Sequence, residues 1–187
     1  MQTDVIKIHD VGGPEKMKWE TINLSKPISN EVLIKHTFVG LNYIDTYHRS
    51  GLYPLQLPSG IGMEGAGVIE EIGEKVTNFR PGDRVVYACP PPGSYSKARI
   101  ISATNIVKIP SFIKDEDAAS IMLKGMTVEY LIKRTFRVKS GQTVLFHAAA
   151  GGVGLIACQW LSSLGVKVIG TVGSEEKATL AKKNGCA

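Results

Sequence analysis

The sequence predicts a mixed fold in which a small, irregular β-barrel is followed by a unit of alternating strands and helices. From Val5 to about Pro110, short apolar stretches are separated by Gly and Pro, a spacing typical of short barrel strands. After Pro110 the apolar residues take up helical spacing, and strand and helix patterns then alternate. Because the pattern changes near residues 110–125, we expect two domains, residues 1–125 and residues 126–187.

Five apolar stretches are the expected barrel strands that follow a first strand near Val5. They are Glu31–Phe38, Gly67–Ile72, Arg84–Ala88, Tyr95–Ile101 and Ile106–Ile109. Turn sequences lie between the strands: Gly12-Gly13-Pro14 follows the first, and Arg80-Pro81-Gly82-Asp83 precedes another. Gly supplies backbone conformations that other residues avoid and Pro fixes φ, so these segments predict turns.

Two helices are expected after the barrel. Asp115, Glu116 and Asp117 come before an apolar run, and acidic side chains in a first turn complement the positive end of a helix. A second helix is expected from Met126 to about Arg134.

The remaining chain predicts the order strand, helix, strand, helix. Strands are expected at Thr143–His147 and Val166–Val172, and a last helix begins at Ser174. The helix between the strands ends at Gly165, and its apolar residues share one face: Val153, Ile156, Ala157, Trp160, Leu161 and Leu164. Two parallel strands are too few for a sheet buried on both faces, so we expect a truncated chain whose complete form continues beyond Ala187.

Composition excludes several classes of protein. The chain has 187 residues, 43% of them hydrophobic and 21% charged, as in soluble globular proteins. Its net charge of +5 comes from 22 basic residues scattered among 17 acidic ones, which indicates a solvated surface more than a nucleic-acid site. The N-terminus has charges among its apolar residues, and no apolar run approaches membrane-spanning length. We expect neither a signal peptide nor a membrane span.

The cysteines and histidines predict a reducing compartment and no metal site. Three cysteines lie far apart without a C-x-x-C pair, which fits a cytoplasmic protein better than a disulfide framework. No two of the four histidines have a spacing typical of metal ligands. They are His9, His36, His48 and His147.

The segment between the first predicted strand and helix of the second domain has a dinucleotide-binding pattern. Ala149-x-Gly151-x-x-Gly154 departs from G-x-G-x-x-G only at its first position. Small residues there let the backbone N–H groups and the helix dipole approach a pyrophosphate. A Gly-rich helix start that merely packs on a strand is the alternative, and the strand and helix on either side favour the nucleotide interpretation.

The end of the second predicted strand favours NADPH over NADH. NAD-binding folds usually place an acidic residue there, whereas this chain has Gly173 and Ser174. Lys177 lies in the first turn of the next helix, where a cation opposes the helix dipole unless a bound 2′-phosphate offsets it. A surface Lys paired with a neighbouring Glu is the alternative.

Four segments, in matching order over essentially the whole chain, resemble the quinone oxidoreductases, the zeta-crystallin branch of the zinc-free medium-chain dehydrogenase/reductase superfamily. Asn42–Pro54 resembles the active-site loop of that branch. Gly62–Val68 and Gly82–Val85 resemble its barrel signature, and Phe146–Gly154 resembles its nucleotide loop.

The resemblance implies a GroES-like β-barrel domain at residues 1–125 and the start of a Rossmann NADPH-binding domain at residues 126–187. It implies a cytoplasmic oxidoreductase that transfers hydride from NADPH to a quinone, with a homodimeric full-length form. An NADPH-dependent enone or alkenal reductase is the enzymatic alternative. A catalytically inactive fragment and a nucleic-acid-binding relative are further alternatives.

Zinc-dependent relatives have a Cys in the segment that is Asn42–Thr46 here, and a His where Met63 stands. Both ligands are missing, and Asn and Met are poor zinc ligands. We therefore expect no metal. Without a Lewis acid, reduction of an electron-poor quinone is favoured over oxidation of an alcohol.

The resemblance also implies the site residues. Tyr43, Asp45, Thr46 and Tyr47 line the nicotinamide end, Thr127 and Tyr130 lie near the cofactor, Gly151, Gly152 and Val153 carry the pyrophosphate, and Gly173, Ser174 and Lys177 hold the 2′-phosphate. Tyr47 is the candidate that polarises or protonates the quinone oxygen, with Asn42 as a supporting hydrogen-bond donor. A Tyr in an aromatic segment can equally shape a pocket by packing, so both interpretations of Tyr47 stay open.

Overall fold

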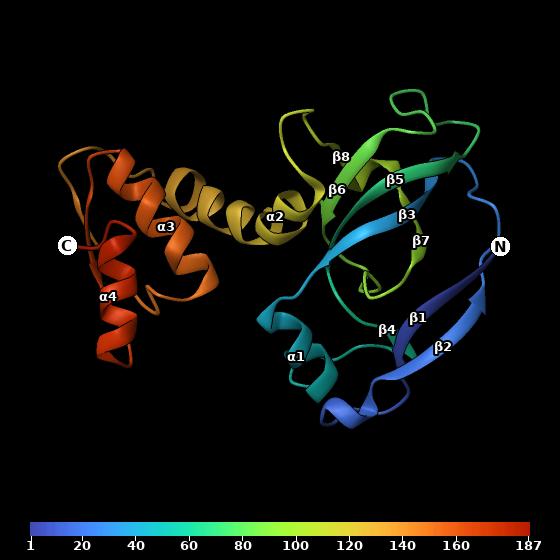
Figure 1. Cartoon of the computed structure of the whole chain (residues 1–187), viewed down its shortest axis with the longest axis horizontal. Coiled ribbons are helices and arrows are strands. Elements are labelled where there is room, and N and C mark those ends of the chain that lie inside the picture. Colours follow the sequence, from blue (N-terminus) through green and yellow to red (C-terminus); the bar gives the residue numbers. More distant parts are fainter. The chain divides into compact units, whose positions relative to one another are not determined.

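The structure is a computed structural model that describes residues 1–187, and the chain forms two compact units. The first unit is Met1–Leu123 and the second is Lys124–Ala187. The boundary falls within α2, which covers Asp115–Glu129 (Figure 1). Each unit has its own buried core, as expected of structural domains.

The first unit is built from two antiparallel sheets. The larger has five strands in the order β7-β3-β5-β6-β8, and the smaller has three in the order β2-β1-β4 (Figure 1). The strands of the larger sheet are β3 Glu31–Gly40, β5 Glu64–Ile72, β6 Arg84–Ala88, β7 Ala98–Ser102 and β8 Val107–Lys108. Those of the smaller are β1 Gln2–Ile8, β2 Lys18–Asn23 and β4 Ser59–Gly60. A bridge between Val5 and Ser96 joins β1 to the segment before β7.

The strands of the larger sheet form because alternating side chains bury one face. On β3, Val32 and Ile34 are fully buried, and Ile69 of β5 and Val85 of β6 lie in the same cluster. β2 was not predicted from the sequence. Its residues Lys18–Asn23 are mostly exposed and mix charged with apolar side chains, so β2 is held by its pairing with β1 more than by burial.

The segment after Asn42 was expected to be a loop, and that expectation is wrong for Tyr43–Ser50, which form helix α1. The Asp45 carboxylate accepts a hydrogen bond from the backbone N–H of Asn42 at 2.9 Å, which satisfies a donor at the start of the helix. Gly51, with φ of 83°, ends the helix in the left-handed conformation. Local hydrogen bonding therefore makes this segment helical.

The two helices expected at Asp115 and at Met126 are one continuous α-helix, α2, followed by a π-helical turn at Tyr130–Thr135. Gly125 lies between the expected helices without interrupting α2, because its φ is not in the left-handed range and a Cβ there would meet open space. The π-helical turn ends at Phe136, whose N–H bonds to the carbonyl of Leu131 at 3.2 Å. Turns of this kind are frequent at functional sites.

The second unit has the predicted order strand, helix, strand, helix. β9 (Thr143–Phe146) and β10 (Lys167–Gly170) pair in parallel, α3 covers Gly152–Ser163, and α4 covers Glu175–Lys183. Cys186 bridges to Val168, and the N–H of Ala187 donates to the Val168 carbonyl at 2.8 Å. The chain therefore adds a third parallel segment on the far side of β10.

The two faces of the β9–β10 sheet differ. Val168 is 1% exposed and packs in one cluster with Ala157 and Leu161 of α3. Leu145 and Ile169, on the opposite face, are 60% and 47% exposed. Successive side chains of a strand point to opposite faces, so α3 covers only one of them. None of the helices combines the length and apolar character that a membrane span requires.

Candidate functional site

The turn from β9 to α3 has the geometry of an anion-binding helix start. Gly151 is the N-cap, Gly152 begins the helix, and no side chain caps it. A Cβ on Gly154 would lie 2.4 Å from the Ala148 carbonyl oxygen and 2.6 Å from that of Ala149, so only Gly lets the helix pack this closely. The N–H groups of the first turn thus stay available to a phosphate.

The departure from the usual glycine at Ala149 has a structural explanation. Ala149 is fully buried, and its N–H donates to the Thr171 carbonyl at 3.1 Å. A Cβ on Gly170 of the neighbouring strand would lie 2.5 Å from the Ala149 methyl group. The missing side chain at Gly170 makes room for that methyl group, so an Ala fits at the first position of the pattern. Ala148, with φ of 54°, makes the tight turn itself.

Gly173, Ser174 and Lys177 lie together at the start of α4, and all three are exposed. Ser174 is the N-cap, and its Oγ accepts a hydrogen bond from the Lys177 backbone N–H at 3.3 Å. The Lys177 side chain forms no ion pair with Glu175 or Glu176. An anion could therefore meet the Ser174 hydroxyl hydrogen, the first-turn N–H groups and the ammonium group together.

One candidate residue of the second unit was missed. The alkyl chain of Lys124 lies beside Gly152, where a Cβ would be 2.9 Å from its Cε. This places a cationic side chain next to the glycine turn. Nothing in the local sequence signals it, because Lys124 precedes Gly152 by a whole helix and strand. Of the predicted neighbours, Thr127 is half-buried and Tyr130 is 48% exposed.

The first unit gathers buried polar groups at the start of α1. Asn42 and Asp45 are each 5% exposed, and Glu64 is fully buried. The Asn42 Nδ2 donates to Glu64 Oε2 at 2.7 Å, and the Tyr95 hydroxyl donates to Asp45 Oδ2 at 2.8 Å. Burial, the hydrogen bond to Asp45 and the charge of Asp45 raise the pKa of Tyr95. Neither Glu64 nor Tyr95 was predicted.

The predicted tyrosines form an aromatic group on α1 and the segment after it. The Tyr47 ring lies 5.2 Å from that of Tyr43 in an edge arrangement and 5.2 Å from that of Tyr53. Tyr43 is 74% exposed, Tyr47 is half-buried, and the Thr46 hydroxyl donates to the Tyr43 carbonyl at 2.6 Å. This packing fits a pocket-shaping role for Tyr47 and leaves its hydroxyl without a hydrogen bond in this unit.

The histidines lie apart in different environments. The His36 Nδ1 donates to the Ser96 carbonyl at 2.7 Å, so its Nε2 accepts from the Tyr87 hydroxyl at 2.8 Å. Burial lowers the pKa of His36 to about 4 and raises that of Tyr87 to about 12. No three His, Cys, Asp or Glu side chains converge in a way that could hold a metal ion.

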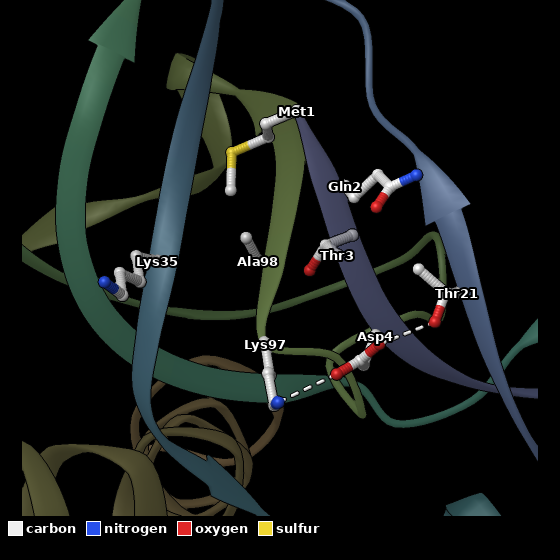
Figure 2. A pocket seen from close by; sticks show the side chains of 8 residues that line it. All are labelled: Met1, Gln2, Thr3, Asp4, Thr21, Lys35, Lys97 and Ala98. Atoms are coloured by element: carbon white, nitrogen blue, oxygen red, sulfur yellow. Dashed lines mark hydrogen bonds and ion pairs between the residues drawn. The ribbon is translucent and has the colours of Figure 1, made fainter.

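A cavity of about 440 Å³ lies between β1 and β7, away from the predicted residues. Figure 2 shows the Asp4 carboxylate there, which accepts hydrogen bonds from Lys97 Nζ and the Thr21 hydroxyl, both at 2.8 Å. These two hydrogen bonds lower the pKa of Asp4. The Asp4 carboxylate is thus already paired within the cavity, and Lys35 pairs with Glu70 outside it.

Comparison with known proteins places these features in context. Residues 28–111 match the alcohol dehydrogenase GroES-like domain family. The chain is 51% identical to a quinone oxidoreductase of Pseudomonas aeruginosa over 93% of its own length and 54% of that protein. It is 45% identical to a 2-haloacrylate reductase of a Burkholderia species, over 96% of this chain and 56% of that protein.

Solved structures of quinone oxidoreductases are also similar to this chain. The crystal structure of Escherichia coli quinone oxidoreductase complexed with NADPH matches with a TM-score of 0.96 and 47% identity, over 98% of this chain and 56% of that one. The chain thus spans about half the length of the relatives it matches. The expected fold class, a GroES-like domain followed by an incomplete Rossmann α/β unit, is confirmed.

Proposed function

Because the chain belongs to the quinone oxidoreductase family of the medium-chain dehydrogenase/reductase superfamily, we propose that its complete protein transfers hydride from NADPH to a quinone. The observation that carries this proposal is the glycine-rich start of α3 at Gly151–Gly154, which no side chain caps. A relative with 47% identity over nearly the whole chain is a complex with NADPH.

The bound cofactor would supply the hydride. The N–H groups of Gly152 and Val153 would hold its pyrophosphate, with Lys124 as an adjacent cation. Gly151, whose N–H donates to the Ala148 carbonyl at 2.8 Å, would line the same site as the N-cap residue. At the start of α4, Gly173 leaves space, and Ser174 and Lys177 would bind the 2′-phosphate through charge-assisted hydrogen bonds.

The remaining predicted residues would orient the reacting end. In this proposal Tyr43, Asp45, Thr46 and Tyr47 surround the nicotinamide, and Thr127 and Tyr130 lie near the cofactor. Tyr47 polarises the acceptor oxygen. The Asn42 amide donates one of its two hydrogens to Glu64. In this proposal its second hydrogen supports the acceptor oxygen of the substrate. Catalysis is then mainly a matter of positioning two reactants.

We propose a zinc-free reaction. Met63 is 8% exposed and Asn42 donates to a carboxylate, so neither is placed as a metal ligand. A quinone accepts hydride at oxygen or carbon without a Lewis acid, because its product is an aromatic hydroquinone. Cytoplasmic location and a homodimeric complete protein belong to the same proposal. The absence of a C-x-x-C pair or a disulfide framework in the sequence supports a reducing compartment.

Reduction of an activated alkene is the second candidate, favoured by the 45% identity to a 2-haloacrylate reductase. Both substrate classes accept hydride at an electron-poor carbon or oxygen conjugated with a carbonyl group. The positioning residues would therefore be shared, and the shape of the pocket would decide between them.

Steady-state oxidation of NADPH with a panel of acceptors tests the proposal. We expect turnover with small ortho- or para-quinones and at most weak turnover with 2-chloroacrylate or simple enones. The same panel with NADH in place of NADPH controls for cofactor choice. Turnover with activated alkenes alone would replace the first candidate by the second, and saturable NADPH binding without any turnover would contradict both.

A further inference from the structure

Glu64, the first residue of β5, is a fully buried carboxylate that accepts hydrogen bonds on both oxygens. Asn42 Nδ2 donates to Oε2 at 2.7 Å, and the Leu123 backbone N–H donates to Oε1 at 2.7 Å. Asn42 is the N-cap of α1 and Leu123 belongs to α2. One carboxylate therefore joins a strand to two helices within the first unit.

The chain makes room for this carboxylate at Gly40, the last residue of β3. A Cβ on Gly40 would lie 2.2 Å from Glu64 Oε2 and 2.3 Å from the Ala119 carbonyl oxygen of α2. The contact with a backbone atom cannot be relieved by rotating a side chain. Gly40 is thus required by the close approach of Glu64 and α2, and the position of the carboxylate is fixed.

Asn42 is held by its backbone as well as its side chain. Its N–H donates to Asp45 Oδ2 at 2.9 Å, and the same oxygen accepts the Tyr95 hydroxyl hydrogen at 2.8 Å. Buried polar groups are costly to leave unbonded, so this network strongly favours one arrangement of the helix start. By contrast, Tyr43, the next residue along the chain, is 74% exposed and its ring packs against Tyr47 of the same helix.

We propose that Glu64 is a positioning residue, which acts through the Asn42 side chain to fix the start of α1 and thereby the placement of Tyr43 and Tyr47. The effect on turnover rests on the proposed function. The effect on α1 does not. A carboxylate is needed because both donors require an acceptor: a carboxamide at position 64 would satisfy one and turn its own N–H group toward the other.

The chemistry allows a rescue. In Glu64→Gln the new NH₂ group is a hydrogen-bond donor. It would face another donor, either the Asn42 amide or the Leu123 N–H. Adding Asn42→Asp moves the carboxylate to position 42, where it can accept the new amide hydrogen, while the carboxamide oxygen still accepts from Leu123. Asn42→Asp alone sets two carboxylates against each other. Glu71→Gln is the matched control, because Glu71 is exposed on the same strand.

Hydrogen exchange of the α1 amides, followed by mass spectrometry, tests the structural step. We expect exchange at Tyr43–Ser50 to be faster by about tenfold or more in Glu64→Gln and in Asn42→Asp. The double variant is expected to return within about threefold of the parent chain, and Glu71→Gln to match the parent. Unchanged α1 exchange in a folded Glu64→Gln protein would overturn the proposal. If that variant does not fold, a double variant that folds with parental α1 exchange supports it, and one that does not fold overturns it.

Turnover with NADPH and a quinone, measured at a temperature where every variant is folded, tests the functional step. We expect kcat to fall about tenfold or more in Glu64→Gln while the Kd for NADPH stays within about threefold, and we expect the control Glu71→Gln to keep the parental kcat. A lower melting temperature with parental kcat would assign Glu64 a purely structural role and overturn the proposal. A parent protein without turnover would count against the proposed function alone, since the exchange result stands by itself.

Discussion

The two units build their parts of the candidate site by different means. In the second unit the groups offered to a ligand are backbone N–H groups, exposed by Gly151 and Gly152 at an uncapped helix start. In the first unit they are side chains on α1, held by a buried network through Glu64 and Asp45. The backbone site depends on close approaches such as that of Gly154 to the Ala148 carbonyl, whereas the side-chain site depends on charge and hydrogen-bond polarity.

The cores of the two units also differ: the first contains buried polar groups, and the second is built mainly from apolar side chains. The first unit encloses its polar groups, including the His36–Tyr87 pair, between paired strands. The second packs α3 on one face of a short parallel sheet and leaves Leu145 and Ile169 exposed on the other. The first unit should therefore respond to pH, and the second to changes of side-chain volume.

The largest effect is expected for Gly154→Ala. Its Cβ would lie 2.4 Å from a backbone oxygen, so the turn must open and its N–H groups must move. We expect NADPH affinity to fall by about a hundredfold or more, as measured by fluorescence titration. Gly125→Ala is the matched control, because its Cβ meets open space in α2. Equal loss of affinity in both variants would contradict a specific role for the turn.

Acid is expected to weaken the first unit through His36. Burial lowers its pKa from 6.5 to about 4, so the unfolded chain binds the proton first. The contribution is complete above about pH 6.5 and is lost as the pH falls toward 4, a change of roughly 3 kcal/mol. Urea unfolding of the parent and His36→Gln measures it.

The His36→Gln variant should be less stable at neutral pH yet nearly insensitive to pH in that window. The carboxylates of Asp4 and Asp83 have lowered pKa values, so their contributions are lost only below about pH 4. A parental pH slope between 6.5 and 4 in His36→Gln would show that another group is responsible.

Substitution of Val168 and of Ile169, which are neighbours on β10 and point to opposite faces, compares the two faces of the short sheet. Val168→Ala removes methyl groups from a buried cluster and should cost about 2 kcal/mol of unfolding free energy. Ile169→Ala, on the exposed face, should cost well under about 1 kcal/mol in this chain. Thermal unfolding of the two variants side by side gives the difference. Similar losses would mean that the Ile169 face is covered in solution.

The smaller of the two effects on cofactor binding is expected for Lys177→Ala. Removing one exposed ammonium group from the start of α4 should weaken NADPH binding about tenfold and leave NADH binding unchanged. Parallel titrations of the two cofactors measure this. Lys183→Ala, in the last turn of the same helix, is the control. An equal loss for both cofactors would remove the assignment of Lys177 to the 2′-phosphate.

Local features were predictable from the sequence, and long-range ones were not. The segment Ala149–Gly154 and the helix after it are contiguous, so spacing alone indicated their geometry. The same was true of Ser174 at the start of α4. Glu64 gave no such signal, because its partners Asn42 and Leu123 are brought to it only by the fold.

Two errors in the predicted elements have local causes. The N-x-x-D pattern of Asn42 and Asp45 is a helix-start signal that was outweighed by the expectation of a loop. Gly125 suggested a break that α2 does not make, since an isolated Gly only lowers helix propensity. The compensation between Ala149 and Gly170 could not be read from the sequence, because it depends on the register of two parallel strands.

Fluorescence titration of the 187-residue chain with NADPH and with NADH tests most directly whether the glycine turn and the start of α4 form a cofactor site. We predict saturable binding of NADPH, with NADH bound about tenfold or more weakly. Absence of saturable NADPH binding, or equal affinity for the two cofactors, would contradict it.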